Sequence, residues 1–193
     1  KSVSSPTAEM TGTRDAAIQK EILYILKDSK NYDAKTRSYM AMALNHFPGK
    51  ASEEALREAL KEDSQEIQLA ALWSLGSLGV RSAAAEIETF LSSTQPELRK
   101  MAVYILGVLG ERSETVKIRP LLNDPVADVR WNAALALARL QDDSGQRVLE
   151  EMLDRRNFPE KGMEEPQIEA AMINAIKGLA LLQKPESIKI FES

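Results

Sequence analysis

Residues Val129–Gln141 read VRWNAALALARLQ, and two other stretches of the chain align with them without gaps. These stretches are Ile67–Gly79 (IQLAALWSLGSLG) and Leu98–Gly110 (LRKMAVYILGVLG), so the three copies are spaced 31 residues apart. Thr36–Pro48 (TRSYMAMALNHFP) fits this spacing more loosely, and Ile168–Leu179 (IEAAMINAIKGL) fits once eight residues are inserted before it. A fixed period of this length is typical of repeat architectures.

The apolar residues of each copy recur at helical spacing. In the Val129–Gln141 copy they are Val129, Ala133, Ala136, Leu137 and Leu140, which share one face of a helix. The equivalent residues are Ile67, Ala71, Ser74, Leu75 and Leu78 in one copy, and Leu98, Ala102, Ile105, Leu106 and Leu109 in the other. One buried stripe is thus repeated three times, which predicts a helix with the same packing role in each copy.

Amphipathic segments between the copies predict a partner helix for each, at about residues 15–27, 52–62, 83–91, 113–122 and 145–155. We expect Gly79 and Gly110 to end helices, because glycine adopts the left-handed conformation at little cost. Pro96 and Pro125 should open helices, because proline is tolerated in the first turn. Residues 185–193 predict a further C-terminal helix. A single pair cannot bury its apolar face, so we expect a stack of pairs rather than a four-helix bundle.

The stretch Asn123–Leu140, NDPVADVRWNAALALARL, resembles the second helix of a HEAT repeat. The marks are Asp-Pro at the turn, then Val-Arg, then a helix rich in Ala and Leu. The short period resembles the HEAT-like repeats of bacteria, including those named after phycobilisome lyase subunits, over residues 14–183. The resemblance implies an all-α fold, a right-handed α-α superhelix of about five helix pairs plus the C-terminal helix, whose second helices line the concave side.

Composition narrows the classes of protein and partner. Hydrophobic residues make up 44% and charged residues 28% of the chain, which is typical of a soluble globular protein. The formal net charge of −4 argues against nucleic acid, which needs a basic surface. The chain has no Cys, which excludes disulfides and Cys-ligated metals. No apolar run is long enough to span a membrane.

We expect residues 1–13 to be a flexible lead-in and residues 14–193 to form a single domain. The sequence begins with Lys1 rather than Met, as it would after removal of a signal peptide or a trim of the chain. An extracytoplasmic (periplasmic) location is favoured over a cytoplasmic one. The oligomeric state is open, with a monomer favoured.

The helix face opposite the buried stripe suggests a binding surface. At 100° per residue, Trp131 and Leu135 point away from the stripe, where polar residues would be expected if that face met only water. Bulky apolar residues recur there in other copies, and the HEAT resemblance places these rows on the concave side. The predicted groove floor consists of Met42, Leu69, Trp73, Tyr104, Trp131 and Leu135. Either it receives a partner segment, as hot spots rich in Trp and Tyr do, or neighbouring repeats bury it.

Charged residues also recur in register. Glu66, Glu97 and Asp128 form an acidic row along the rim, with Lys35 as the exception. They either prefer a basic partner segment or pair with helix N-termini, where a negative charge is mildly stabilising. Arg37, Gln68, Arg99 and Arg130 occupy another equivalent position. The resemblance implies that these arginines form a structural ladder that braces turns, through the Asp that Asp124 matches.

Residues 157–167 (NFPEKGMEEPQ) interrupt the period. Such an insertion either carries binding specificity or is merely tolerated, since loop closure costs little. His46 is the only histidine, and we expect it at the surface of a helix end. Adjacent carboxylates do not face each other on a helix, so we predict no catalytic residues, no metal and no cofactor. HEAT-like deoxyhypusine hydroxylases hold iron with repeated His-Glu pairs, and this sequence has none.

The favoured function is a non-enzymatic scaffold or adaptor that binds a protein or peptide segment in the concave groove. The alternative is an accessory subunit of an enzyme complex, such as a HEAT-like bilin lyase subunit. A third class, a purely structural spacer, predicts that substitutions in the groove have no effect on binding.

Overall fold

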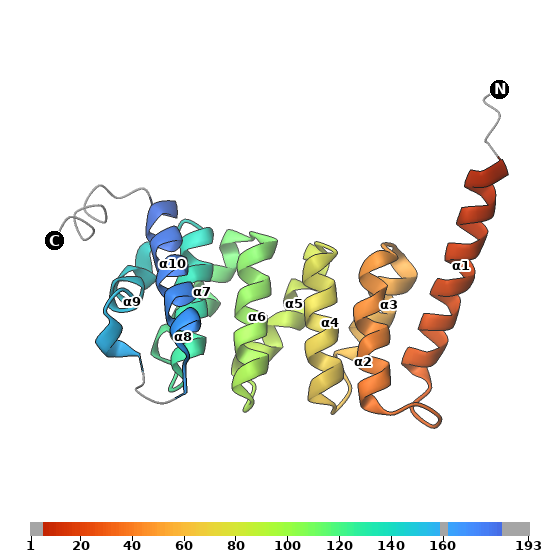
Figure 1. Cartoon of the computed structure of the whole chain (residues 1–193), viewed down its shortest axis with the longest axis horizontal. Helices are drawn as coiled ribbons and strands as arrows, with labels where there is room; N and C mark the ends of the chain where they lie inside the picture. Colours follow the sequence, from red (N-terminus) through yellow and green to blue (C-terminus); the bar gives the residue numbers. More distant parts are fainter. Residues whose placement is uncertain (1–5, 159–161, 183–193) are drawn as a thin grey trace. The chain divides into compact units, whose positions relative to one another are not determined.

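The computed structural model describes residues 6–158 and 162–182, and over these residues it consists of helices and turns, with no strand. Figure 1 shows the helices in chain order. The chain divides into two compact units, residues 1–86 and 87–193. None of the described helices is both long and apolar enough to cross a membrane.

The first unit is built from α1 (Pro6–Lys27), α2 (Ala34–Ala43), α3 (Lys50–Ala59) and α4 (Gln65–Ser77). The short 3-10 helices η1 (Leu44–His46) and η2 (Arg81–Ala83) follow α2 and α4. Helix α2 packs against α1 and α4, and α3 packs against the same two helices. The core between them consists of Ile22, Leu26, Ala41, Leu44, Leu56, Ile67, Leu72 and Leu75. The boundary between the units falls within α5 (Ala84–Glu88).

The second unit contains four longer helical segments: α6 (Pro96–Leu109), α8 (Ala127–Arg139), α9 (Gln146–Glu151) and α10 (Glu165–Leu181). Between α6 and α8 lie η4 (Arg112–Glu114), α7 (Thr115–Ile118) and η5 (Arg119–Asn123). Helix α8 lies at the centre of the packing, because α6, α7, α9 and α10 all contact it. Three further 3-10 segments complete the unit: η3 (Thr89–Ser92), η6 (Asp143–Gly145) and η7 (Arg155–Asn157).

The repeated stripe forms the core, as predicted. Val129, Ala133, Ala136 and Leu137 have no exposed surface in α8, and the stripe residues of α4 and α6 are buried except Leu78, which is half-buried. The five second helices of the predicted pairs are therefore α2, α4, α6, α8 and α10. The right-handed superhelical course of the whole chain stays a prediction.

The predicted helix ends are mostly confirmed. Gly79 and Gly110 adopt positive φ angles of 67° and 79°, and Gln141 occupies the same position with φ 60°. Pro96 is the first residue of α6. The prediction for Pro125 is wrong by two residues, because Val126 is the N-cap of α8.

The partner helices differ most from prediction. The segments around residues 83–91 and 113–122 are short α-helices that continue as the 3-10 helices η3 and η5. Pro120 lies inside η5, where its missing N–H cannot join an α-helical ladder. Helix α1 begins at Pro6, so residues 6–13 of the predicted lead-in are helical. The predicted helix at residues 185–193 lies outside the described residues, and the single domain stays a prediction.

Candidate functional site

Arg99 binds the backbone of one turn and the side chain of another. The Arg99 Nη1 group donates hydrogen bonds to the backbone oxygens of Ser93, at 2.8 Å, and Thr94, at 3.3 Å, in the turn before its own helix. Its Nε and Nη2 groups donate to the two carboxylate oxygens of Asp124, at 2.7 and 2.8 Å. This bidentate pair lowers the pKa of Asp124, against the opposing effect of burial. Arg99 thus joins its own turn to the next one.

The same position is filled in three other repeats. Arg37 donates to the backbone oxygen of Leu26 at 2.7 Å and pairs with Glu62. Gln68 keeps only the backbone part of this role, because its Nε2 donates to the oxygens of Leu60, at 3.3 Å, and Glu62, at 2.6 Å. The bonds of Gln68 therefore involve backbone oxygens alone. Arg130 is bound to backbone oxygens of its own turn.

The first unit holds three of the six predicted groove residues. Met42 and Trp73 are 46% and 39% exposed, whereas Leu69 is half-buried. The Ser74 hydroxyl donates to the Ala41 backbone oxygen at 2.9 Å, which fixes α4 against α2 one residue away from both Trp73 and Met42. These two side chains therefore lie at a similar level on the neighbouring helices α2 and α4.

Sequence reasoning missed Tyr39, which is 54% exposed on α2. It lies three residues before Met42, and residues at this separation are neighbours on a helix surface. We call Tyr39, Met42 and Trp73 the α2–α4 surface. The signal that could have found Tyr39 is its separation from Met42, but its equivalent in α4, Ala70, is buried.

The second unit holds Tyr104, Trp131 and Leu135, and the structure covers most of their surface. Trp131 and Leu135 are half-buried and pack against the cluster of Ala134, Ala138, Leu149, Met152, Ala175 and Leu179. The Trp131 ring meets the ring of Phe158, with centroids 5.1 Å apart. The guanidinium carbon of Arg139 lies 5.3 Å from the centre of the Tyr104 ring. In this unit neighbouring elements cover the predicted floor.

The inserted segment contributes to that cover. Phe158, the second residue of the insertion, is 6% exposed and packs on Trp131. Gln167, its last residue, accepts from the Glu164 backbone N–H at 2.8 Å as part of the capping box that begins α10. Both ends of the described insertion therefore support the packing of the second unit.

The acidic rim lies where helix dipoles stabilise it. Glu66, Glu97 and Asp128 are exposed in the first turns of α4, α6 and α8, where a negative charge is favourable. Asp128 also pairs with Lys100 at 3.3 Å. Lys35 and His46 are exposed. The described residues contain no group of three or more side chains that could hold a metal ion.

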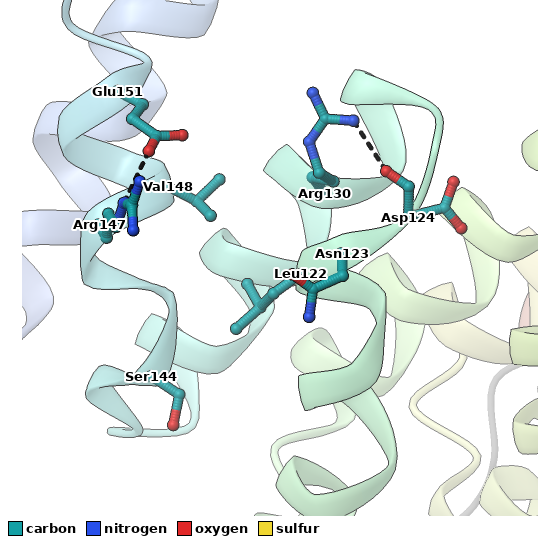
Figure 2. A pocket seen from close by; sticks show the side chains of 8 residues that line it. All are labelled: Leu122, Asn123, Asp124, Arg130, Ser144, Arg147, Val148 and Glu151. Carbon is teal, nitrogen blue, oxygen red and sulfur yellow. Dashed lines mark hydrogen bonds and ion pairs between the residues drawn. The ribbon is translucent and has the colours of Figure 1, made fainter.

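A polar pocket of about 580 Å³ opens in the second unit. Figure 2 shows that its walls come from the end of η5 and the start of α8 on one side, and from η6 and α9 on the other. Leu122 and Val148 provide apolar surface, and Arg130 lines one wall. Its other lining residues are Asn123, Asp124, Ser144, Arg147 and Glu151. Sequence reasoning did not find this pocket, because its residues come from both helices of one repeat and from the first helix of the next.

Comparison with known proteins agrees with the repeat pattern. A family model of HEAT repeats matches residues 19–95 and 83–165. The complex of CpcE and CpcF of phycocyanin lyase from Nostoc sp. PCC7120 contains a similar chain, with a TM-score of 0.63 and 19% identity over 92% of this chain and 81% of that one. An engineered protein is similar with a TM-score of 0.54 and 18% identity, over 88% and 83% of the two chains. No curated protein sequence gives a significant match.

The repeated helices and the match to the family model define a helical repeat protein. The two matched ranges cover more than half of the chain, which therefore belongs to the HEAT repeat family. At identities below 20%, the two solved structures show a shared fold alone.

Proposed function

We propose that this protein is a non-enzymatic scaffold that binds a protein or peptide segment, and that the α2–α4 surface is a docking site. The observation that carries the proposal is the joint exposure of Met42 and Trp73 at one level of two packed helices. Partly exposed Trp and Tyr side chains on a rigid helical surface are the residues that most often dominate binding energy.

The geometry favours an apolar segment with basic flanks. Tyr39, Met42 and Trp73 offer apolar area, while Glu66 is exposed in the first turn of α4. Burying a bulky apolar side chain contributes roughly 1.5–3 kcal/mol. A rim charge mainly affects the association rate and the choice of partner. Tyr104 as a groove residue stays a prediction separate from the α2–α4 surface, whereas packing in the second unit accounts for Trp131 and Leu135.

The test uses a partner identified by capture with the wild-type protein and then purified. A Met42→Ala/Trp73→Ala variant should bind this partner at least tenfold more weakly, since the truncation removes two apolar contacts. Ile18→Ala is the matched control, because Ile18 is 42% exposed on α1 of the same unit. Circular dichroism must first show equal helicity. Equal affinity of the double variant and wild type would contradict the proposal.

An accessory subunit of an enzyme complex is the second candidate. It is supported by the likeness to a chain of the CpcE and CpcF complex, which covers most of both chains. A subunit of this kind should copurify with a chromophore-binding protein or with the chromophore. Visible absorption of the captured complex distinguishes the two functions. A complex that lacks such absorption and still requires Met42 and Trp73 supports the scaffold.

A further inference from the structure

Arg130 is held in the same way as Arg99. Its Nη1 group donates to the backbone oxygens of Asp124, at 2.8 Å, and Pro125, at 3.2 Å. These oxygens belong to the residues six and five positions earlier, and Arg99 uses Ser93 and Thr94 at the same separations. Two hydrogen bonds from this one nitrogen fix the position of the guanidinium group relative to its turn.

The other edge of the two guanidinium groups differs. In Arg99, Nε and Nη2 hold the carboxylate of Asp124, 25 residues further along the chain. Arg37 pairs with Glu62 at the same separation. The residue 25 positions after Arg130 is Arg155, which pairs with Glu165 instead. Among the described residues, Nε and Nη2 of Arg130 have no hydrogen-bond acceptor.

Arg130 lines the pocket, as Figure 2 shows. The two carboxylates in the pocket wall already have cationic partners: Asp124 pairs with Arg99, and Glu151 accepts from Arg147 Nε at 2.9 Å. Asp124 also attracts the charge of Arg130, but both of its carboxylate oxygens are bonded to Arg99. The Nε and Nη2 groups of Arg130 therefore remain available to another acceptor. The amide of Asn123 and the hydroxyl of Ser144 add polar groups.

We infer that this pocket binds the carboxylate of an aspartate or glutamate side chain from a protein partner. The two oxygens take the place on Arg130 that Asp124 takes on Arg99, accepting from Nε and Nη2, while Leu122 and Val148 contact the methylene groups. Such a planar, bidentate pair is the strongest common arrangement for a carboxylate. The inference rests on the proposed function only for the source of the carboxylate, a protein.

The probe is the peptide acetyl-Ala-Glu-Ala-amide, and its matched control is acetyl-Ala-Gln-Ala-amide. In protein with ¹⁵N-labelled arginine, the Nε–H signal of Arg130 should shift saturably with the glutamate peptide. The glutamine peptide should leave it in place, and the Arg99 signal should not move with either. Inorganic phosphate is a third arm, because it also binds arginine. Tighter binding of phosphate than of the glutamate peptide would overturn the assignment to a carboxylate.

Arg130→Gln tests the residue without removing the brace. Gln68 shows that glutamine at this position still donates to two backbone oxygens of its turn, so the variant should fold. Backbone amide shifts of Leu122 and Val148 then follow the peptide, which should bind about tenfold more weakly or worse. Arg112→Gln, at an exposed arginine of the same unit, changes the charge equally and should bind like wild type. Equal binding by the two variants would refute the inference.

This experiment is independent of the proposed docking site. Loss of partner capture by the Met42→Ala/Trp73→Ala variant depends on the first unit, whereas the peptide titration depends on the pocket of the second unit. If the protein is a scaffold whose pocket binds no carboxylate, the Met42→Ala/Trp73→Ala variant still loses partner capture, but the glutamate peptide causes no shift. If the pocket binds the peptide but Met42 and Trp73 take no part in partner capture, the glutamate peptide causes a shift and the double variant captures partners like wild type.

Discussion

At the scale of single residues, the ladder shows how one position serves two separable purposes. Gln68 retains the bonds to its own turn, and Arg99 adds a bidentate pair with the next turn. The backbone bonds satisfy carbonyl groups that would otherwise need water. The carboxylate pair joins one repeat to the next. The difference between glutamine and arginine therefore isolates the energy of the link between repeats.

Arg99→Gln should lower the free energy of unfolding by about 1–3 kcal/mol, because it leaves the buried Asp124 carboxylate without its cation. Urea denaturation measures the loss, with Arg112→Gln as the control. Arg99 lowers the pKa of folded Asp124 below the ordinary value of 3.8. The stabilisation is therefore present above that value and lost as the pH falls through the folded pKa. A loss that stays constant down to pH 2 would contradict this account.

Glu114 gives the opposite pH dependence. Burial is the largest cause that raises its pKa, and the neighbouring Glu88, itself paired with Lys117, raises it further. A raised folded pKa contributes stability that is complete below the unfolded value of 4.5 and is lost as the pH rises through the folded pKa. Glu114→Gln should thus be more stable than wild type at pH 8, by an amount on the order of 1 kcal/mol.

Denaturation at pH 4, 6 and 8 tests this prediction. The gain from Glu114→Gln should shrink toward pH 4, where wild-type Glu114 is protonated as well. Glu169→Gln, at an exposed residue of α10, removes the same charge and should show no such trend. A destabilised Glu114→Gln protein at pH 8 would mean that the Glu114 carboxylate is needed in its charged form.

The predicted site residues show which features can be predicted when the sequence is projected onto a helix. This projection identified the buried stripe of the three gap-free copies correctly, since that face is apolar there except at Ser74. The projection could not predict which side chains on the opposite face are exposed, because later parts of the chain cover some of them. Phe158 packs on Trp131 of α8, whereas Trp73 of α4 remains 39% exposed. Nothing in the alternation of residues within α8 specifies that Phe158 returns to it.

At the scale of helices, the second helices and the partner helices α1, α3 and α9 were predictable, whereas the 3-10 parts of the partner segments at 83–91 and 113–122 were not. Each second helix carries a full apolar stripe, which fixes both its existence and its buried face. The partner segments around residues 83–91 and 113–122 are shorter, and local groups there compete with the α-helical ladder. Ser92 donates its hydroxyl to the Thr89 backbone oxygen at 3.2 Å, and Pro120 lacks an N–H. The resulting 3-10 turns leave no clear periodic signal.

Helices α6 and α8 approach closely at Gly107. A Cβ atom added there would lie 2.7 Å from the Ala136 Cβ and 2.8 Å from its Cα, so the two helices would have to separate. Gly107→Ala should therefore destabilise the protein by about 1–3 kcal/mol, even though alanine favours helices. Gly12→Ala, where no atom lies within 4 Å of the added Cβ, should be neutral or stabilising. Equal melting temperatures for these two variants would refute the close approach.

At the scale of the whole molecule, most of the predicted fold followed from the 31-residue register. It identified the all-helical class and the HEAT resemblance, and the family match covers residues 19–95 and 83–165. A repeat contacts mainly its neighbours, so the register indicates which helices meet but not which surface a partner uses. Proteins that share one fold can have different functions. The docking surface and the pocket therefore depend on individual side chains that the register does not specify.

The two tryptophans lie in different units, and the chain has no others. Trp73 is 39% exposed, whereas Trp131 is half-buried beside Phe158. The protein thus contains one tryptophan fluorophore for each unit. Trp131→Phe should emit at longer wavelength than Trp73→Phe, because its remaining indole meets more water. Coincident emission spectra would contradict these environments, and distinct ones let the melting of each unit be followed without an attached label.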